Sequence, residues 1–189
     1  MLRDLIEKTR TCRRFKQDEP ISTETLRELV DLTRLTPSAG NAQPLRYVLS
    51  NDPMRNGLIF GCLGWAGHLK GWAGPAEGER PAAYIIILGD TQVADTFSVD
   101  HGIAAYAILL GARERGLAGC IVGSVQRPLL RERLRISDRY QILLVIALGV
   151  PAEEVVIEAV GKDGNTAYWR DREGVHHVPK RALDDIILD

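Results

Sequence analysis

The chain has 189 residues, and its 24 lysine and arginine residues against 25 aspartate and glutamate residues give a formal net charge of −1. This length predicts one domain, residues 1–189, with a real core, since chains of this size bury roughly 70% of their unfolded surface. Nucleic acid is not expected as a partner, because the strong cationic field that it usually needs is missing.

The first predicted element is a short amphipathic helix, in which Leu2, Leu5 and Ile6 recur at helical spacing. It leads into Arg10-Thr11-Cys12-Arg13-Arg14-Phe15, where guanidinium groups and a hydroxyl offer forked donors suited to a phosphate. Taken alone, this arginine segment is also consistent with a solvated basic turn.

A second helix is predicted after Ser22, a plausible N-cap, and it ends before Pro37. The stretch Pro37-Ser38-Ala39-Gly40-Asn41-Ala42-Gln43-Pro44 then combines a proline, small residues and two carboxamides able to read the edge of a heterocycle. Alone it reads equally as a loop that terminates a helix. Together with the arginine segment it suggests a bound phosphorylated cofactor. Arg46–Ser50 is predicted as a strand, closed by a turn at Asn51–Pro53.

Residues Met54–Pro81 are glycine-rich and contain Trp65 and Trp72. We predict one helical piece over Trp65–Trp72, followed by a loop over Ala73–Pro81. Loops of this length tend to be functional or mobile, so Trp65–Pro81 is a lid candidate. The alternative is that both tryptophans simply pack on the surface of the core.

Two unbroken apolar runs, Tyr84–Leu88 and Ile142–Leu148, are typical of strands covered on both faces and predict the centre of a sheet. Between them, Val99–Arg115 is apolar almost all round and stops at Gly116, which predicts a deeply buried helix with a glycine cap. Such a helix needs cover on every side, and a partner subunit would supply it. Val122–Ser124 reads as a glycine-rich turn, and Pro128 suits the first turn of a further short helix.

The last part of the chain carries a hairpin signal at Asp171–Gly174, flanked by Thr166–Arg170 and Val175–Val178. His176 and His177 would point to opposite faces of a strand. Leu183, Ile186 and Ile187 suggest a final helical or docking segment.

Several familiar sites are absent from the sequence. No segment reaches the length of a membrane span, no apolar run at the N-terminus resembles a signal peptide, and three cysteines without a CxxC pair favour a reducing cytoplasm. Neither GxGxxG nor GxxxxGK[ST] occurs, and the four histidines lack metal-ligand spacing, so we expect no metal site. No catalytic nucleophile is expected either. What remains describes a site for a flat heterocycle with a polar edge and a phosphate tail, and flavin mononucleotide (FMN) fits it.

On these motifs the chain resembles the nitroreductase family of FMN-dependent NAD(P)H oxidoreductases. The arginine segment is similar to the family's Arg-Ser-x-Arg-x-aromatic start, and Pro37–Pro44 follows the family pattern closely. Supporting matches are the helix Asp100–Gly116, the following Gly119–Ser124 turn, the strand end Ala147–Pro151 and Lys180–Leu183. Thr11 stands where the family usually has serine, and Leu45 where it often has tryptophan.

The resemblance implies an α+β three-layer sandwich, with a central mostly antiparallel sheet flanked by helices, that dimerises through its long helix and holds two FMN sites at the subunit interface. Arg10, Thr11 and Arg13 of one subunit would contact the phosphate, ribityl or pyrimidine end of the flavin. Pro37, Ser38 and Asn41, in the stretch Pro37–Pro44, would come from the other subunit. The backbone of Gly123 would serve the flavin N5, and Lys180 or Arg181 would complete the phosphate clamp. The implied cofactor-binding residues are Arg10, Thr11, Arg13, Pro37, Ser38, Ala39, Asn41, Gly123, Lys180 and Arg181.

The implied activity is electron transfer from NAD(P)H through FMN to a small acceptor, such as a nitroaromatic or a quinone, by a ping-pong mechanism. We nominate no acid or base residue, because the flavin performs the redox step. Two alternatives stay open. Some members of the family use flavin for dehalogenation or fragment the flavin itself, and the chain could also be a non-catalytic FMN-binding module.

Overall fold

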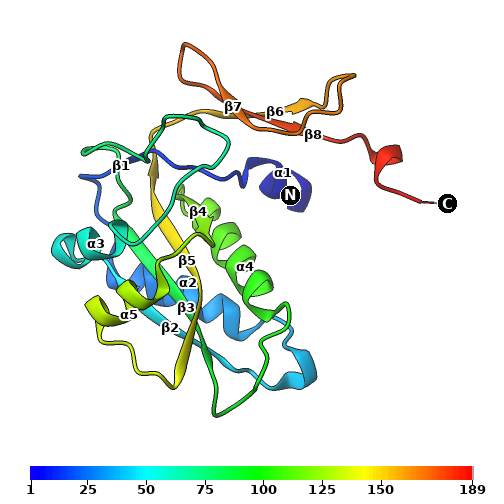
Figure 1. Ribbon diagram of the computed structural model, residues 1–189. Coiled ribbons are helices and arrows are strands. Elements are labelled where there is room, and N and C mark those ends of the chain that lie inside the picture. Colours follow the sequence, from blue (N-terminus) through cyan, green and yellow to red (C-terminus); the bar gives the residue numbers. More distant parts are fainter. Residues whose placement is uncertain (189) are drawn as a thin grey trace.

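The computed structural model describes residues 1–188 and contains a five-stranded antiparallel sheet (Figure 1). Its strands are β1 (Phe15–Lys16), β2 (Leu45–Ser50), β3 (Ala83–Asp90), β4 (Ala118–Val122) and β5 (Tyr140–Pro151). The order across the sheet is β1-β5-β3-β2, and β4 pairs with β5 as well. The long β5 therefore holds three other strands in place.

The centre of the sheet is apolar on both faces, as the sequence predicts. Every residue of β3 is buried. Ile85 and Ile87 pack into one hydrophobic core, whereas Tyr84 and Ile86 pack into another. Side chains alternate along a strand, so two cores on opposite faces require a helical layer on each side.

The described residues form five helices: α1 (Leu2–Lys8), α2 (Thr23–Arg34), α3 (Pro53–Phe60), α4 (Asp100–Glu114) and α5 (Arg127–Leu134). Helices α2 and α4 cover one face, and α3 and α5 cover the other. The predicted N-cap is confirmed, because the Ser22 Oγ accepts the backbone N–H of Thr25 at 3.0 Å. The predicted three-layer α+β sandwich is thereby confirmed. Among residues 1–188, no helix is both long enough and apolar enough to cross a bilayer.

Helix α3 begins at Pro53, the last residue of the predicted Asn51–Pro53 turn, and continues through residues 54–60, for which the sequence predicted no element. The Asp52 side chain accepts the backbone N–H of Arg55 at 2.8 Å, and Pro53 occupies the first turn. An aspartate N-cap followed by proline is a helix start signal, so this element was readable from the sequence.

The predicted helical piece Trp65–Trp72 is wrong. The segment forms separate turns, in which Leu69 N–H donates to Ala66 O and Trp72 N–H donates to Leu69 O. Ala66 and Gly71 have positive φ values of 37° and 76°, which a right-handed helix does not accept.

The turn at Gly119–Ser124 that the family resemblance implies is also wrong for most of its length, because Ala118–Val122 is strand β4, and only Gly123 and Ser124 lie outside the strand. In the register with β5, Gly119 lies opposite Leu148 and Val122 opposite Val145. The sheet therefore ends only before Gly123.

A second, three-stranded sheet lies above the first (Figure 1) and consists of β6 (Val155–Ala159), β7 (Trp169–Arg170) and β8 (His176–Lys180). The hairpin is confirmed, since β7 and β8 pair antiparallel and Asp171 N–H donates to Val175 O at 3.1 Å. The sequence reading missed β6, which pairs parallel with β8. After β8 the chain extends away from both sheets, and its 3-10 helix at Leu183–Asp185 is exposed.

The described residues bury one side of helix α4 and leave apolar side chains exposed on the other. Its inner face, including Ala104, Ala105 and Ile108, is fully buried. Val99, Ile103 and Tyr106 follow helical spacing, and they are 65%, 36% and 38% exposed. We call this second apolar stripe, which starts at the N-cap residue Val99, the outer face of α4. It is the part of the all-round apolar pattern that residues 1–188 leave partly exposed.

We predict that Gly119→Ala destabilises the protein by about 1–3 kcal/mol, because an added methyl would overpack the site. A Cβ there would lie 2.7 Å from the carbonyl oxygen of Ala147, which is backbone and cannot move aside cheaply. Gly57→Ala is the control, because Gly57 lies inside α3 with nothing within 4 Å of an added Cβ. That change should stabilise by about 0.5–1 kcal/mol. Urea unfolding measures both, and an unchanged midpoint for Gly119→Ala would contradict the packing argument.

Candidate functional site

The arginine segment Arg10–Phe15 crosses the edge of the main sheet. Thr11 forms a bridge with Gly119, and Cys12 N–H donates to Gly119 O at 3.0 Å. Farther along, Phe15 is fully buried and pairs with Pro151 of β5. The backbone around the two arginines is therefore anchored at both ends.

Arg10 presents a buried donor that lacks a partner. Its Nη2 donates to the carbonyl oxygen of Ile6 at 2.7 Å, which fixes the side chain against α1. Its Nε is buried and has no hydrogen-bond partner within residues 1–188. A buried, unpaired donor on a charged group is costly, and an anionic oxygen would satisfy it. The residues present therefore fit the phosphate of an FMN.

Arg13 is held between an aromatic ring and a histidine. Its guanidinium carbon lies 4.6 Å from the centre of the Tyr168 ring, and its Nη1 lies 3.2 Å from His176 Nε2. Because arginine only donates, His176 Nε2 must accept in this contact. Burial is the main cause that lowers the pKa of His176, to about 4, and the positive charges of Arg13 and Arg170 act in the same direction against Glu153. The positive charge here is carried by the arginine.

Glu153 fixes the backbone of the same segment. Its Oε1 accepts the backbone N–H groups of Arg13 and Arg14, and its Oε2 accepts Arg170 Nη2 at 2.6 Å. The Glu153 side chain is only 1% exposed. These two N–H groups are therefore occupied, and a bound anion would have to meet side chains instead.

The lid candidate is tied to the second sheet. His68 N–H donates to the Tyr168 hydroxyl at 3.4 Å, and the two rings meet edge to face at 5.0 Å. Arg170 stacks over Trp72 with 4.9 Å to the ring centre. Trp65 instead packs against Phe60 of α3 at 5.7 Å. Trp65 thus follows the alternative interpretation, because it packs on the core. Trp72 belongs to the lid candidate, which meets the second sheet.

The carboxamide loop Pro37–Gln43 lies at the opposite end of α4 from the arginine segment (Figure 1). The Ser38 hydroxyl donates to Asp100 Oδ2 at 2.6 Å, and Ala39 N–H donates to Asp100 Oδ1 at 3.1 Å. The Asn41 side chain is exposed. Helix α4 is about 22 Å long at 1.5 Å per residue, so it separates the two motifs.

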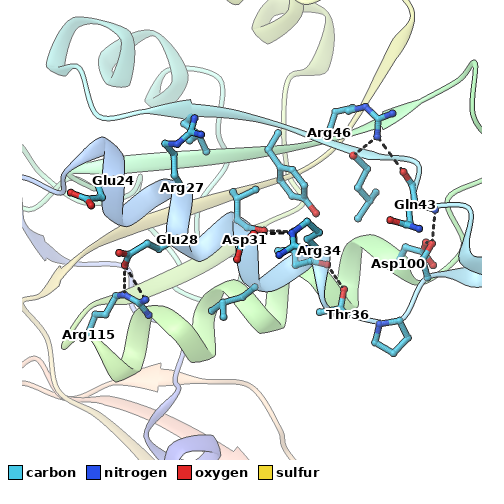
Figure 2. A pocket seen from close by; sticks show the side chains of 18 residues that line it. Glu24, Arg27, Glu28, Asp31, Arg34, Thr36, Gln43, Arg46, Asp100 and Arg115 are labelled. Carbon is cyan, nitrogen blue, oxygen red and sulfur yellow. Dashed lines mark hydrogen bonds and ion pairs between the residues drawn. The ribbon is translucent and has the colours of Figure 1, made fainter.

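An open groove of about 1180 Å³ borders this loop, between α2 and β2 (Figure 2). It reaches Pro37, Ser38, Gln43 and Asp100 at one end. Neither Arg10 nor Arg13 lines it. Its walls mix acidic and basic side chains, as in the pair of Glu28 with Arg115 at 3.0 Å. The groove is therefore a neighbour of the carboxamide loop rather than the phosphate site.

The remaining predicted residues lie apart from both groups. Gly123 is exposed at the end of β4 and has room around it, because only a Leu144 methyl comes within 4 Å of an added Cβ. Lys180 ends β8 and Arg181 follows it, and both are exposed. Lys180 lies four residues beyond His176, which is about 13 Å along a strand. Arg10, Thr11 and Arg13 thus lie on one segment at the sheet edge. Within residues 1–188 no hydrogen bond or ion pair joins that segment to Pro37, Ser38, Ala39 or Asn41.

The sequence reading missed the residues that hold these motifs in place. Glu153, Tyr168 and His176 support the arginine segment, and Asp100 supports the carboxamide loop. Only Asp100 had a readable signal, since it is an acidic residue in the first turn of a predicted helix.

Comparisons with known proteins bear on the family and the fold of the chain. The model of the nitroreductase family matches residues 6–55 and 72–150. A 5,6-dimethylbenzimidazole synthase of Rhodospirillum rubrum is 27% identical over 200 residues, covering 94% of this chain and 92% of that protein. A chloronitrobenzene nitroreductase of Comamonas testosteroni is 25% identical over 193 residues, covering 77% and 85%. The solved structure of an FMN-dependent nitroreductase of Clostridium difficile R20291 superimposes with a TM-score of 0.64 at 22% identity, covering 79% of this chain and 87% of that one.

We predict that His176 makes the folded state less stable in mild acid. Its folded pKa of about 4 lies below the ordinary value of 6.5, so between these values the unfolded chain takes up a proton that the folded chain does not. Stability should fall as the pH drops through this window. His176→Gln should flatten the fall, measured by urea unfolding across the same range.

His177 gives the matched contrast. Burial lowers its pKa, but hydrogen bonds with Asp171 and Glu158 outweigh burial and raise it overall. Its contribution is therefore complete below 6.5 and lost as the pH rises through the folded value. His177→Gln should remove the loss of stability as the pH rises above 6.5, and it should leave the slope between pH 4 and 6.5 unchanged. If His176→Gln also left that acid slope unchanged, the slope would not come from His176.

Proposed function

The chain belongs to the nitroreductase family, and from that premise we propose that it is an FMN-dependent oxidoreductase. It would pass reducing equivalents from NAD(P)H to a small acceptor such as a nitroaromatic or a quinone. The observation that supports FMN at this site is the buried, unpaired Nε of Arg10, which comes three residues before the anchored Arg13 on the same segment. Two fixed cations with a free donor suit a phosphate.

The proposed site is shared between two copies of the chain. The arginine segment and the carboxamide loop lie toward opposite ends of α4, and the hydrogen bonds and ion pairs of residues 1–188 join no residue of one to the other. The outer face of α4 and the exposed Leu2 and Ile6 of α1 offer an apolar surface for a partner. A homodimer would cover this surface and bring one copy's loop to the other copy's arginines.

Within such a site each residue has a distinct task. Arg10, Thr11 and Arg13 would bind the phosphate and ribityl end, and Lys180 or Arg181 would add charge there. Pro37, Ser38, Ala39 and Asn41 of the partner subunit would frame the ring. The hydroxyl of Ser38 already donates to Asp100 and accepts Gln43 N–H at 2.9 Å, so it would offer the flavin only a remaining lone pair. The backbone N–H of Gly123 would donate toward N5, and FMN itself supplies the hydride chemistry.

A second candidate function has its own support. The 5,6-dimethylbenzimidazole synthase covers 94% of this chain, more than the 77% of the nitroreductase of Comamonas testosteroni. Formation of 5,6-dimethylbenzimidazole by the flavin-loaded protein, followed by mass spectrometry, would favour fragmentation of the flavin. Oxidation of NADH or NADPH with a quinone or nitroaromatic, without that product, would favour the oxidoreductase. No turnover of either kind would favour a non-catalytic FMN-binding module.

We predict that Arg13→Ala weakens FMN binding by about tenfold to a hundredfold, since a charge-assisted hydrogen bond contributes roughly 1.5–3 kcal/mol. Fluorescence titration of the purified protein with FMN measures the affinity. Arg3→Ala is the control, because Arg3 is an exposed cation on α1 whose side chain is 93% exposed. Equal FMN affinity in Arg13→Ala and Arg3→Ala would remove the arginine segment from the site.

We also predict ping-pong kinetics, because the sequence contains one flavin-type site and no separate dinucleotide motif. NAD(P)H and the acceptor would then use the same place in turn. An initial-rate matrix with NADPH and a quinone should give parallel double-reciprocal lines, and intersecting lines would contradict this. Trp72→Ala, which frees the loop from Arg170, should change acceptor preference more than FMN affinity. Loss of flavin without a change in acceptor preference would instead assign the loop to cofactor retention.

A further inference from the structure

The carboxamide loop has one buried ionic support. Asp100, the first residue of α4, is only 4% exposed. Its two carboxylate oxygens accept the Ser38 hydroxyl at 2.6 Å and the Ala39 N–H at 3.1 Å. The Ser38 Oγ in turn accepts Gln43 N–H at 2.9 Å. A single carboxylate thus closes the loop from its first residues to its last.

The backbone that this carboxylate closes is unusual. Gly40, Asn41 and Gln43 have φ values of 57°, 55° and 50°. The left-handed region costs little for glycine and is tolerated by asparagine, but it is uncommon for glutamine. Residues in such conformations persist where the surroundings over-determine them, and they cluster at functional sites. The hydrogen bonds through Asp100 and Ser38 supply that constraint.

The loop faces outward from its support. Ala39, Gly40 and Asn41 are exposed, whereas Asp100 beneath them is buried. Asp100 also lies at the N-terminus of α4, where the helix dipole favours a negative charge. The carboxylate is therefore placed to hold the loop from behind, and it leaves the outer surface free for a ligand.

We propose that Asp100 is a positioning residue for the flavin site of the partner subunit. It fixes the left-handed turn at Gly40–Gln43, and the loop then meets the flavin held by Arg10 and Arg13 of a second copy. This inference rests on the proposed function, because it assumes that FMN binds and that two copies share each site. Asp100 touches no flavin atom and takes part in no electron transfer.

The first experiment separates positioning from general stability. Asp100→Ala should raise the Kd for FMN by at least about tenfold, because the loop loses its closed conformation. Asp100→Asn keeps an acceptor for Ala39 N–H and should give an intermediate Kd. Asp52→Ala is the control, since Asp52 is another helix N-terminal carboxylate and caps α3. It should lower the Tm of the flavin-free protein without changing the Kd.

The second experiment tests whether Asp100 acts on the partner's site. Two differently tagged chains, one carrying Arg13→Ala and the other Asp100→Ala, are co-expressed, and the mixed dimer is purified through both tags. If each site joins one copy's arginines to the other copy's loop, both defects fall on one site. The other site is then intact, so half of the FMN should bind with the wild-type Kd. If Asp100 acted within its own chain, each site would carry one defect and no wild-type phase would appear.

The outcomes are separable. A wild-type protein that binds no FMN would overturn the proposed function. FMN binding by wild type together with an unchanged Kd in Asp100→Ala, or in Asp100→Asn should the alanine variant not fold, would overturn only the positioning role. An equal loss of affinity in Asp52→Ala would also overturn it, because the effect would then follow stability. A mixed dimer without a wild-type phase would overturn action on the partner subunit.

Discussion

The carboxylate of Glu153 joins three parts of the chain that are far apart in sequence. It accepts the backbone N–H groups of Arg13 and Arg14 and pairs with Arg170. A buried carboxylate is costly to leave unpaired, so this arrangement strongly favours one position for the arginine segment relative to the second sheet. Tyr168 and His176 reach Arg13 only because that sheet is held there. The lid candidate depends on the same anchor, since His68 and Trp72 contact Tyr168 and Arg170.

The environment of Arg13 decides which group carries positive charge. Histidine and arginine are neighbours here, and burial lowers the pKa of His176 to about 4. The histidine therefore stays neutral at ordinary pH and acts as an acceptor for Arg13. An arginine remains charged throughout this range, so the charge of Arg13 does not change with pH. A site built on a titrating histidine would instead vary with pH.

Helix α4 links the two halves of the proposed site while keeping them apart. Its first residue, Asp100, supports the carboxamide loop, and its inner face packs against α2. Its outer face is apolar and exposed, through Val99, Ile103 and Tyr106. Cover for this face and completion of the site would come from the same event, the docking of a second copy. A partner would then be needed both to bury the apolar face of α4 and to complete the flavin site.

The sequence by itself determined the layers and the two motifs. Unbroken apolar runs at Tyr84–Leu88 and Ile142–Leu148 required cover on both faces, and hence the central strands of a three-layer sandwich. Ser22, Gly116 and the hairpin at Asp171–Gly174 are local signals, and the structure confirms each of them. Local signals failed at Trp65–Trp72, where glycines outweighed the helical spacing.

Only the tertiary structure decided what supports the motifs. Glu153 lies 140 residues from Arg13, and Asp100 lies 62 residues from Ser38, so no periodicity relates these partners. Their pairing depends on how helices and sheets pack, which is a property of the whole chain. The separation of the arginine segment from the carboxamide loop is of the same kind, because the direction and length of α4 set it. Sequence patterns identified the groups that suit a flavin, and the packing determined that one chain holds them apart.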